Sequence, residues 1–143
     1  MKFYVDTCIW LNLFKKEENF SKGQPYWKIA EEFIKKVIFS EHEIVYSGFV
    51  LKEIKHRLNY ELFKEVHKLL KKEPKFCFVK ALEEDYLFAR KLELAFNFEI
   101  GFFDCQHIAI CKRLGCILVT RDNKLIACAR RHINVEKPEK LLP

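Results

Sequence analysis

Short apolar runs alternate with longer amphipathic stretches along almost the whole chain, and this alternation constrains the fold more than any other feature. Runs such as Phe3-Tyr4-Val5 and Ile117-Leu118-Val119 have the length and composition of strands buried in a sheet. Longer stretches such as 26–39 carry apolar residues at helical spacing. Because parallel strands need helical crossovers between them, the pattern predicts an α/β domain with a mainly parallel sheet.

The expected elements follow one another without a repeat or an evident linker. We expect strands at 3–5, 43–46, 75–80, 117–120 and 133–135. We expect helices at 7–14, 26–39, 49–58, 60–72, 82–96, 102–114 and 123–131. A polar loop is expected at 15–25, and the whole chain, 1–143, is expected to form one domain.

The composition indicates a folded chain with a basic surface. Of the 143 residues, 50% are hydrophobic and 15% are aromatic, which excludes the disordered class. The formal net charge is +6 and the pI is about 9.0. Such a charge attracts anionic partners over long distances, but many merely soluble proteins carry it too. Charge alone therefore leaves both interpretations open.

The cysteines and the chain start indicate a reducing compartment. The six cysteines include no C-x-x-C pair, so neither a zinc ribbon nor a thioredoxin motif is indicated. Most lie between apolar neighbours, as Cys77 does, and we interpret them as small core residues. The acid at Asp6 interrupts the first apolar run too early for a secretory signal, and no run approaches membrane-spanning length. We expect a cytoplasmic protein without membrane association.

Two aspartates directly follow expected strands. Asp6 comes after the strand at 3–5, and Asp122 comes shortly after the strand at 117–120. Ligands of parallel α/β sheets bind beyond the carboxyl ends of the strands, so both acids are expected at the same rim. Each also precedes an expected helix, and an ordinary helix N-cap remains an equally good interpretation of either acid alone. The Thr120 hydroxyl is placed to orient Asp122 or a water molecule.

Two further acids lie within the apolar arcs of expected helices. At about 100° per residue, Glu53 falls on the inward face of its helix, where Arg57 at i+4 offers a plain surface partner. Asp104 falls between Ile108 and Cys111 on the buried side of the helix at 102–114. A buried carboxylate needs a cation, a hydrogen-bonded partner or a proton, so Asp104 implies a bound cation or a salt bridge to a neighbouring helix.

Taken together, the four acids predict a metal site. If the fold brings Asp6, Glu53, Asp104 and Asp122 together, their oxygens form a hard ligand set. Such a set suits Mg²⁺ or Mn²⁺ better than zinc, which prefers nitrogen and sulfur. The basic balance of the chain then favours a polyanionic substrate.

The order and surroundings of these acids resemble those of the PIN-domain ribonucleases, from Lys2 to Val135. Four segments carry the resemblance: Tyr4-Val5-Asp6-Thr7, Val50-Leu51-Lys52-Glu53-Ile54, Phe103-Asp104-Cys105-Gln106-His107-Ile108-Ala109 and Leu118-Val119-Thr120-Arg121-Asp122. Size and architecture are similar to those of the compact prokaryotic group that includes VapC-type toxins. Cys8 departs from the pattern, because many relatives carry a polar Asn or Ser there.

The resemblance implies a three-layer α/β/α sandwich and a Mg²⁺- or Mn²⁺-dependent endoribonuclease that hydrolyses RNA phosphodiester bonds. It implies that the four acids are the catalytic and metal-binding residues, supported from behind by Thr7 and Thr120. It also implies a homodimer and, for a toxin, a small antitoxin protein as partner. Whether the chain is a toxin stays open.

Basic residues beside the acids are the expected phosphate contacts. The four positions are Lys52, Arg57, Arg121 and Lys124. His107, one turn after Asp104, is interpreted as a satisfied core histidine rather than as a proton carrier. Two other functions remain open: a catalytically silent PIN-like module that binds RNA or a protein, and a structural protein whose acids only cap helices and pair with lysines.

Overall fold

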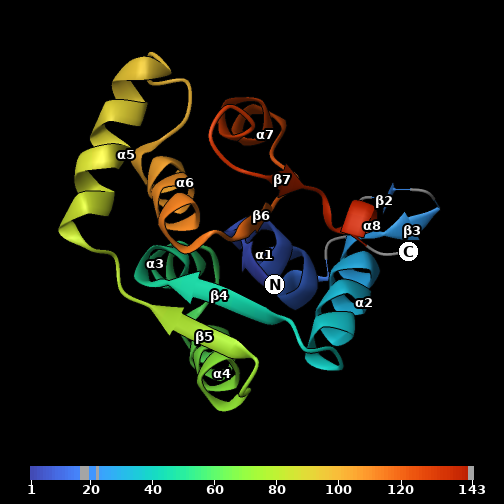
Figure 1. Cartoon of the computed structure of the whole chain (residues 1–143). Coiled ribbons are helices and arrows are strands. Elements are labelled where there is room, and N and C mark those ends of the chain that lie inside the picture. Colours follow the sequence, from blue (N-terminus) through green and yellow to red (C-terminus); the bar gives the residue numbers. More distant parts are fainter. Residues whose placement is uncertain (17–19, 22, 142–143) are drawn as a thin grey trace.

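The structure, a computed structural model, describes residues 1–16, 20, 21 and 23–141 (Figure 1). Parts of two expectations, the loop at 15–25 and the domain 1–143, lie outside the described residues, at 17–19, 22 and 142–143. The strands are β1 (Lys2–Val5), β2 (Phe20–Ser21), β3 (Gln24–Pro25), β4 (Glu43–Ser47), β5 (Phe76–Val79), β6 (Ile117–Val119) and β7 (Val135–Glu136). The helices are α1 (Thr7–Lys15), α2 (Tyr26–Ile38), α3 (Gly48–Arg57), α4 (Tyr60–Lys72), α5 (Glu83–Ala95), α6 (Phe102–Leu114), α7 (Asn123–Ala129) and α8 (Pro138–Leu141).

In the described part of the chain, five parallel strands form the central sheet in the order β5-β4-β1-β6-β7. The middle strand, β1, pairs on both sides: Tyr4 lies opposite Val45 of β4 and Leu118 of β6. The chain moves from β1 outward through β4 to β5, then returns to β6 and moves outward the other way to β7. The order therefore reverses between β1 and β6.

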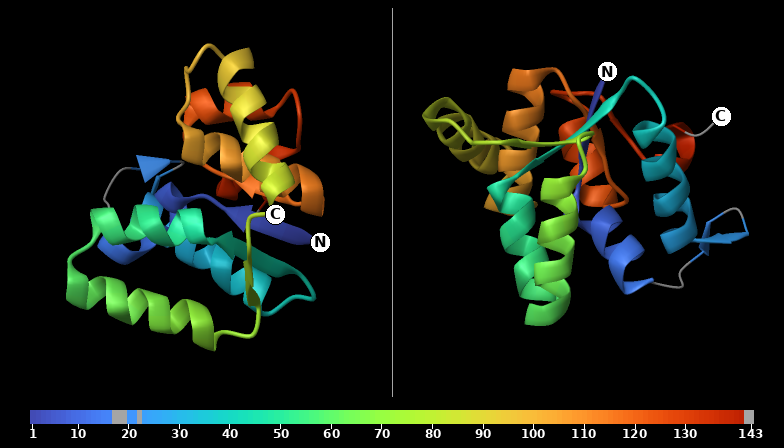
Figure 2. Two further views of the ribbon diagram at one scale, coloured as in Figure 1. Left: turned by 90° about the vertical axis from the view of Figure 1, so that its left-hand side faces the viewer. Right: turned by 90° about the horizontal axis from the view of Figure 1, so that it is seen from below.

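Helices cover both faces of this sheet, which confirms the three-layer α/β/α sandwich. In Figure 2, α1 to α4 lie on one face and α5, α6 and α7 on the other. Right-handed crossovers require this division, because the two halves of the sheet are built in opposite directions. The helices that follow β1 and β6 consequently leave the sheet on opposite sides. They open a crevice at the carboxyl ends of these two strands, where such folds bind ligands.

The core explains why the central strands are apolar throughout. Val5, Ile44 and Leu118 each have 0% of their surface exposed, since helices cover them from both faces. Trp10 of α1 is also fully buried, and its indole N–H donates to the Val5 carbonyl at 3.2 Å. This rigid centre positions the ends of β1 and β6.

Local differences from the expected elements lie at the margins. Two short strands, β2 and β3, pair antiparallel within the expected loop, and α8 follows β7 where no helix was predicted. Helix α7 ends at Ala129, before the expected 131, because the Ala129 carbonyl accepts the N–H groups of His132 and Ile133 in a turn. Such short elements depend on tertiary contacts rather than on periodicity. No helix in the described part of the chain is long and apolar enough to cross a membrane.

An ion pair between the buried Asp85 and the partly exposed Arg113 holds α5 against α6. Arg113 Nε donates to both Asp85 carboxylate oxygens, at 3.0 and 3.1 Å, and the Leu82 N–H donates to Oδ2 at 2.8 Å. Asp85 is 2% exposed. This acid shows how a purely structural carboxylate is satisfied in the fold: by an arginine and a backbone amide.

We expect Arg113→Met to lower the free energy of unfolding by roughly 2–4 kcal/mol, because it leaves a buried carboxylate without its cation. Urea denaturation measures the change. The matched control is Lys35→Met, which breaks an exposed pair with Glu31 (3.1 Å) and is expected to cost less than about 0.5 kcal/mol. Equal costs for the two variants would contradict the structural importance of the Asp85–Arg113 pair.

Candidate active site

The four predicted acids line one pocket of about 470 Å³ in the crevice between β1 and β6. Asp6 ends β1, Asp122 precedes α7, Glu53 lies on α3 and Asp104 lies in the first turn of α6. Residues that are far apart in the sequence therefore meet at the carboxyl end of the sheet. Cys8, Asn12, His56 and Arg57 also line the pocket.

Asp6 is held in place by three donors. Its Oδ1 accepts from the backbone N–H of Thr7 at 2.8 Å, and its Oδ2 accepts from the Thr120 hydroxyl at 2.7 Å. The Cys8 thiol donates to Oδ2 at 3.3 Å. Burial raises the pKa of this thiol well above its usual range, and the charge of Asp6 raises it further, so the thiol keeps its proton. Asp6 is 5% exposed and has a fixed orientation.

Asp122 lies between β6 and α7, as Asp6 lies between β1 and α1. It caps α7, and its Oδ1 accepts the N–H groups of Lys124 and Leu125 at 3.0 and 3.2 Å. Its own N–H donates to the Thr120 hydroxyl at 3.1 Å. Thr120 thus connects the two aspartates: it accepts from the Asp122 backbone and donates to the Asp6 side chain. Asp122 itself is exposed at the pocket mouth.

Glu53 is fixed through one of its oxygens. Its Oε1 accepts from the Thr7 hydroxyl at 3.1 Å and lies 2.8 Å from His107 Nε2. Its side chain is 29% exposed. No ion pair in the described part of the chain joins Glu53 to Arg57, the simple surface partner considered above. Glu53 therefore belongs to the pocket rather than to the surface.

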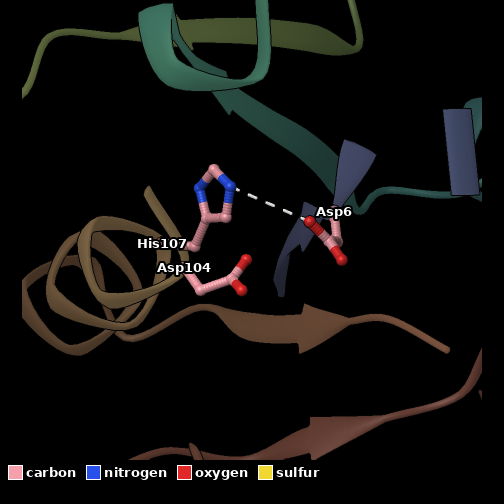
Figure 3. Close-up of side chains that lie close together, drawn as sticks. All are labelled: Asp6, Asp104 and His107. Atoms are coloured by element: carbon pink, nitrogen blue, oxygen red, sulfur yellow. Dashed lines mark ion pairs between the residues drawn. The ribbon is translucent and has the colours of Figure 1, made fainter. Parts of the chain in front are cut away.

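Asp104 is the most perturbed of the four acids. Burial, and next the charge of Asp6, raise the pKa of Asp104 from its ordinary 3.8 to about 7. The charges of Glu53 and Asp122 act in the same direction, whereas His107 lowers the pKa. In Figure 3, Asp104 and His107 project from α6 toward Asp6, and the dashed line marks the 3.8 Å separation of His107 Nε2 and Asp6 Oδ1.

His107 is completely buried beneath the acids. Its Nδ1 lies 2.6 Å from the Tyr4 hydroxyl, and its Nε2 faces Glu53. Burial works to lower the pKa of His107, but the Glu53 hydrogen bond and the charges of Asp6, Glu53 and Asp104 outweigh burial and raise it. The imidazole is therefore a satisfied buried group, as predicted, but it belongs to the site.

The pocket fits a hard divalent cation. An oxygen of Asp6 and an oxygen of Asp104 lie within 4.8 Å of each other, and a nitrogen of His107, which is already hydrogen-bonded, lies within the same distance of both. Burial, and next crowding by like charges, raise the pKa of Asp104. A cation relieves both effects, and no lysine or arginine contact to Asp104 does so in the described residues. The carboxylates supply the oxygen ligands that Mg²⁺ and Mn²⁺ prefer.

Three of the expected phosphate contacts are exposed. Arg57 lines the pocket, whereas Lys52 and Lys124 do not line it but lie one residue from Glu53 and two residues from Asp122, respectively, in the sequence. Lys52 also lies over the Phe49 ring at 5.7 Å.

Arg121 is placed differently. Its Nη1 donates to Glu139 Oε2 at 2.9 Å, its guanidinium lies 3.9 Å above the Tyr26 ring, and its side chain is 9% exposed. The guanidinium is thus committed to α8 and α2 and does not line the pocket. We leave Arg121 out of the proposed substrate contacts.

Some residues of the site were not assigned a role from the sequence. Tyr4 and Ser47 lie behind His107, and their hydroxyls are 2.6 Å apart. Both are polar residues within or at the end of buried strands, which is a weak signal, because their partners depend on the packing of α6. The Cys8 thiol was interpreted as a packing residue, and it contacts Asp6 from inside the pocket.

The comparisons with known proteins agree with the fold. The family profile described as PIN domain matches residues 3–131. No curated protein matches the chain. Among solved structures, a chain of VapBC2 from Rickettsia felis, bound to promoter DNA, has a TM-score of 0.71 at 14% identity and covers 96% of this chain and 98% of its own.

Two further structures have the same fold. A chain of VapBC-1 from nontypeable Haemophilus influenzae has a TM-score of 0.69 at 18% identity, with 97% of this chain and 99% of that chain covered. VapC20 of Mycobacterium tuberculosis, a toxin that cleaves the sarcin–ricin loop, has a TM-score of 0.68 at 15% identity, with 87% and 93% covered. At such low identities the likeness establishes the fold alone.

In metal-free buffer at pH 8, we expect Asp104→Asn to raise the free energy of unfolding by roughly 1–3 kcal/mol. The folded-state pKa of about 7 lies above the ordinary 3.8, so the folded chain binds this proton more tightly. The associated stability is present at low pH and is lost as the pH rises through 7, and Asn removes that loss. Urea denaturation in EDTA at pH 5.5 and pH 8 measures it.

Asp122→Asn is the control for this experiment, because its exposed side chain keeps the cap and is expected to change stability by less than about 0.5 kcal/mol. A loss of stability in Asp104→Asn at pH 8 would indicate a structural ion pair and contradict the crowded-acid account.

Proposed function

The chain belongs to the PIN-domain family, and we propose on this premise that it is a metal-dependent endoribonuclease that hydrolyses RNA phosphodiester bonds. The convergence of Asp6, Glu53, Asp104 and Asp122 in one pocket carries the proposal. We propose that residues 1–143 act as one PIN-like domain and that the protein works in the cytoplasm.

Asp6 and Asp104 would hold the cation, Mg²⁺ or Mn²⁺, with Glu53 and Asp122 completing its surroundings. When bound, such a cation polarises phosphoryl oxygens, lowers the pKa of water and stabilises the charge that develops during in-line attack. The chain itself supplies orientation. The Thr120 hydroxyl and the Thr7 N–H fix Asp6, and the Thr7 hydroxyl fixes Glu53. Asp104 must lose its proton to serve as a ligand, and its raised pKa makes cation binding pH-dependent.

The RNA backbone would be held by the basic residues around the acids. Arg57 lines the acidic pocket, and Lys52 and Lys124 are exposed within two residues of its acids in the sequence, so they would bind flanking phosphates while one phosphate is presented to the acids. Contacts of this kind position a strand without reading its sequence.

We further propose that the protein is the toxin of a toxin–antitoxin pair and forms a homodimer. VapBC complexes and the toxin VapC20 are among the structures with this fold, which motivates a small antitoxin protein as partner. Leu87 and Leu94, two turns apart on the same side of α5, are 60% and 66% exposed and offer an apolar contact for a second copy. A monomer mass in light scattering would contradict the dimer.

With Mn²⁺ present, the wild-type chain is expected to cleave single-stranded RNA, and Asp104→Asn and Asp6→Asn are expected to lose roughly 100-fold or more in rate. The loss should exceed that of an outer-sphere change, which is about 10–100-fold. Gel analysis of labelled RNA measures it. Glu65→Gln, the same chemical change at an exposed position of α4, is the control and is expected to stay active.

Equal cleavage by wild type and Asp104→Asn would indicate a contaminating nuclease. If RNA bound without being cut by any purified sample, the chain would be a silent binding module instead.

In EDTA, where no cleavage occurs, Lys52→Ala and Lys124→Ala are each expected to lower the slope of log affinity against log salt by about 0.7 for single-stranded RNA. Each removes one phosphate contact. Fluorescence anisotropy at several salt concentrations measures the slope. Lys35→Met on α2 should leave it unchanged, and an equal change for all three variants would mean that the surface acts only through its net charge.

A further inference from the structure

A continuous chain of hydrogen bonds runs from the middle of the sheet to Glu53. The Ser47 hydroxyl lies 2.6 Å from the Tyr4 hydroxyl, which lies 2.6 Å from His107 Nδ1. His107 Nε2 lies 2.8 Å from Glu53 Oε1. The members come from β4, β1, α6 and α3, so the chain links both faces of the sheet to one carboxylate.

The direction of each hydrogen bond follows from the groups at the two ends. A carboxylate only accepts, so His107 Nε2 carries the proton that faces Glu53. In the neutral imidazole Nδ1 is therefore an acceptor, and the Tyr4 hydroxyl donates to it. Ser47 Oγ accepts the Phe49 N–H at 3.3 Å and donates its own proton to the Tyr4 oxygen. Burial raises the pKa of Tyr4 well above its usual value, so the phenol keeps its proton. In this sense the Ser47 hydroxyl, the Tyr4 hydroxyl and the His107 N–H each donate one hydrogen bond.

The hydrogen-bond chain is buried away from solvent, so each of its polar groups needs a partner. Ser47, Tyr4 and His107 each have 0% of their surface exposed. An unpaired polar group in such a place costs about 1–3 kcal/mol, so apolar residues would serve the core better if packing were the only requirement. The hydrogen-bond chain ends at a carboxylate of the pocket, Glu53, so the buried polar groups can act on the site.

We propose that Tyr4, Ser47 and His107 form a positioning relay that locks Glu53, by its Oε1, in the orientation in which its Oε2 faces the cation. This inference rests on the proposed function for its catalytic consequence. The known contacts agree with it: Thr7 and His107 both engage Oε1, and no described residue forms a hydrogen bond with Oε2. His107 is a positioning residue here and not a ligand, since both its nitrogens are occupied.

Two amide substitutions at position 107 separate the two ends of the imidazole. The amide nitrogen of Gln reaches the place of Nε2, so His107→Gln keeps a donor for Glu53 and loses the Tyr4 contact. The shorter Asn side chain reaches only the place of Nδ1, so His107→Asn keeps a partner for Tyr4 and loses the donor for Glu53. The two variants bury comparable amides, and a role limited to packing would affect them alike.

The experiment measures the Mn²⁺ affinity of the full chain by isothermal titration calorimetry. We expect His107→Gln to bind Mn²⁺ within about threefold of wild type and His107→Asn to bind about 10–100-fold more weakly, the range for loss of an outer-sphere partner. Gln106→Leu is the control, because Gln106 is also fully buried on α6, and none of the described hydrogen bonds joins it to the acids. It should bind Mn²⁺ like wild type.

Tyr4→Phe gives a second test that preserves the core volume. Without the phenol, His107 Nδ1 has no proton donor, while Nε2 still faces Glu53. Ring ¹⁵N shifts in the metal-free protein should show the Nε2–H form in both proteins, with the Nδ1 signal of Tyr4→Phe moved toward that of an imidazole nitrogen that accepts no hydrogen bond. Unchanged shifts in Tyr4→Phe, or equal Mn²⁺ affinities for His107→Gln and His107→Asn, would overturn the relay. If the wild-type protein binds Mn²⁺ but does not cleave RNA, the proposed nuclease function is contradicted, whereas the positioning relay is not.

Discussion

The crowding of carboxylates in one partly buried pocket is the constraint on which the rest of the site depends. Burial, and next the charges of Asp6, Glu53 and Asp122, raise the pKa of Asp104 to about 7. The fold holds the acids together with fixed donors: backbone amides at helix starts, the hydroxyls of Thr7 and Thr120, and the imidazole of His107. None of these contacts neutralises the pocket in the way that an arginine neutralises Asp85. The proposed function assigns a divalent cation to this pocket.

The alternatives that the sequence left open for Asp6 and Asp122 are not exclusive. Both acids are N-caps, and both line the pocket. A carboxylate has two oxygens with several lone pairs, so a helix start can be capped on one side while a ligand is approached on the other. The cap also fixes the orientation of the acid. In a sheet whose strand order reverses between β1 and β6, the first residues of α1 and α7 necessarily meet at the crevice, and helix starts therefore supply two of the four acids.

The sequence was sufficient to predict the features that depend on periodicity and on the order of residues along the chain. The strand and helix pattern predicted the α/β sandwich, and the inward positions of Glu53 and Asp104 on their helices predicted their convergence with the strand-end aspartates. It was insufficient where packing decides. Arg121 follows a site strand in the sequence, but Glu139 of α8, a helix that no pattern indicated, draws its guanidinium away. Likewise, Tyr4 and Ser47 become parts of the site only because β1, β4 and α6 bring them to His107.

The central claim is that Asp6, Glu53, Asp104 and Asp122 hold one hard dication between them. Anomalous diffraction from crystals soaked in Mn²⁺ tests it most directly, because the signal locates the ion without reference to activity. The account predicts a single strong peak in the pocket, within coordination distance of Asp6 and Asp104. A peak only at surface sites, with the pocket filled by water or a lysine side chain, would contradict it.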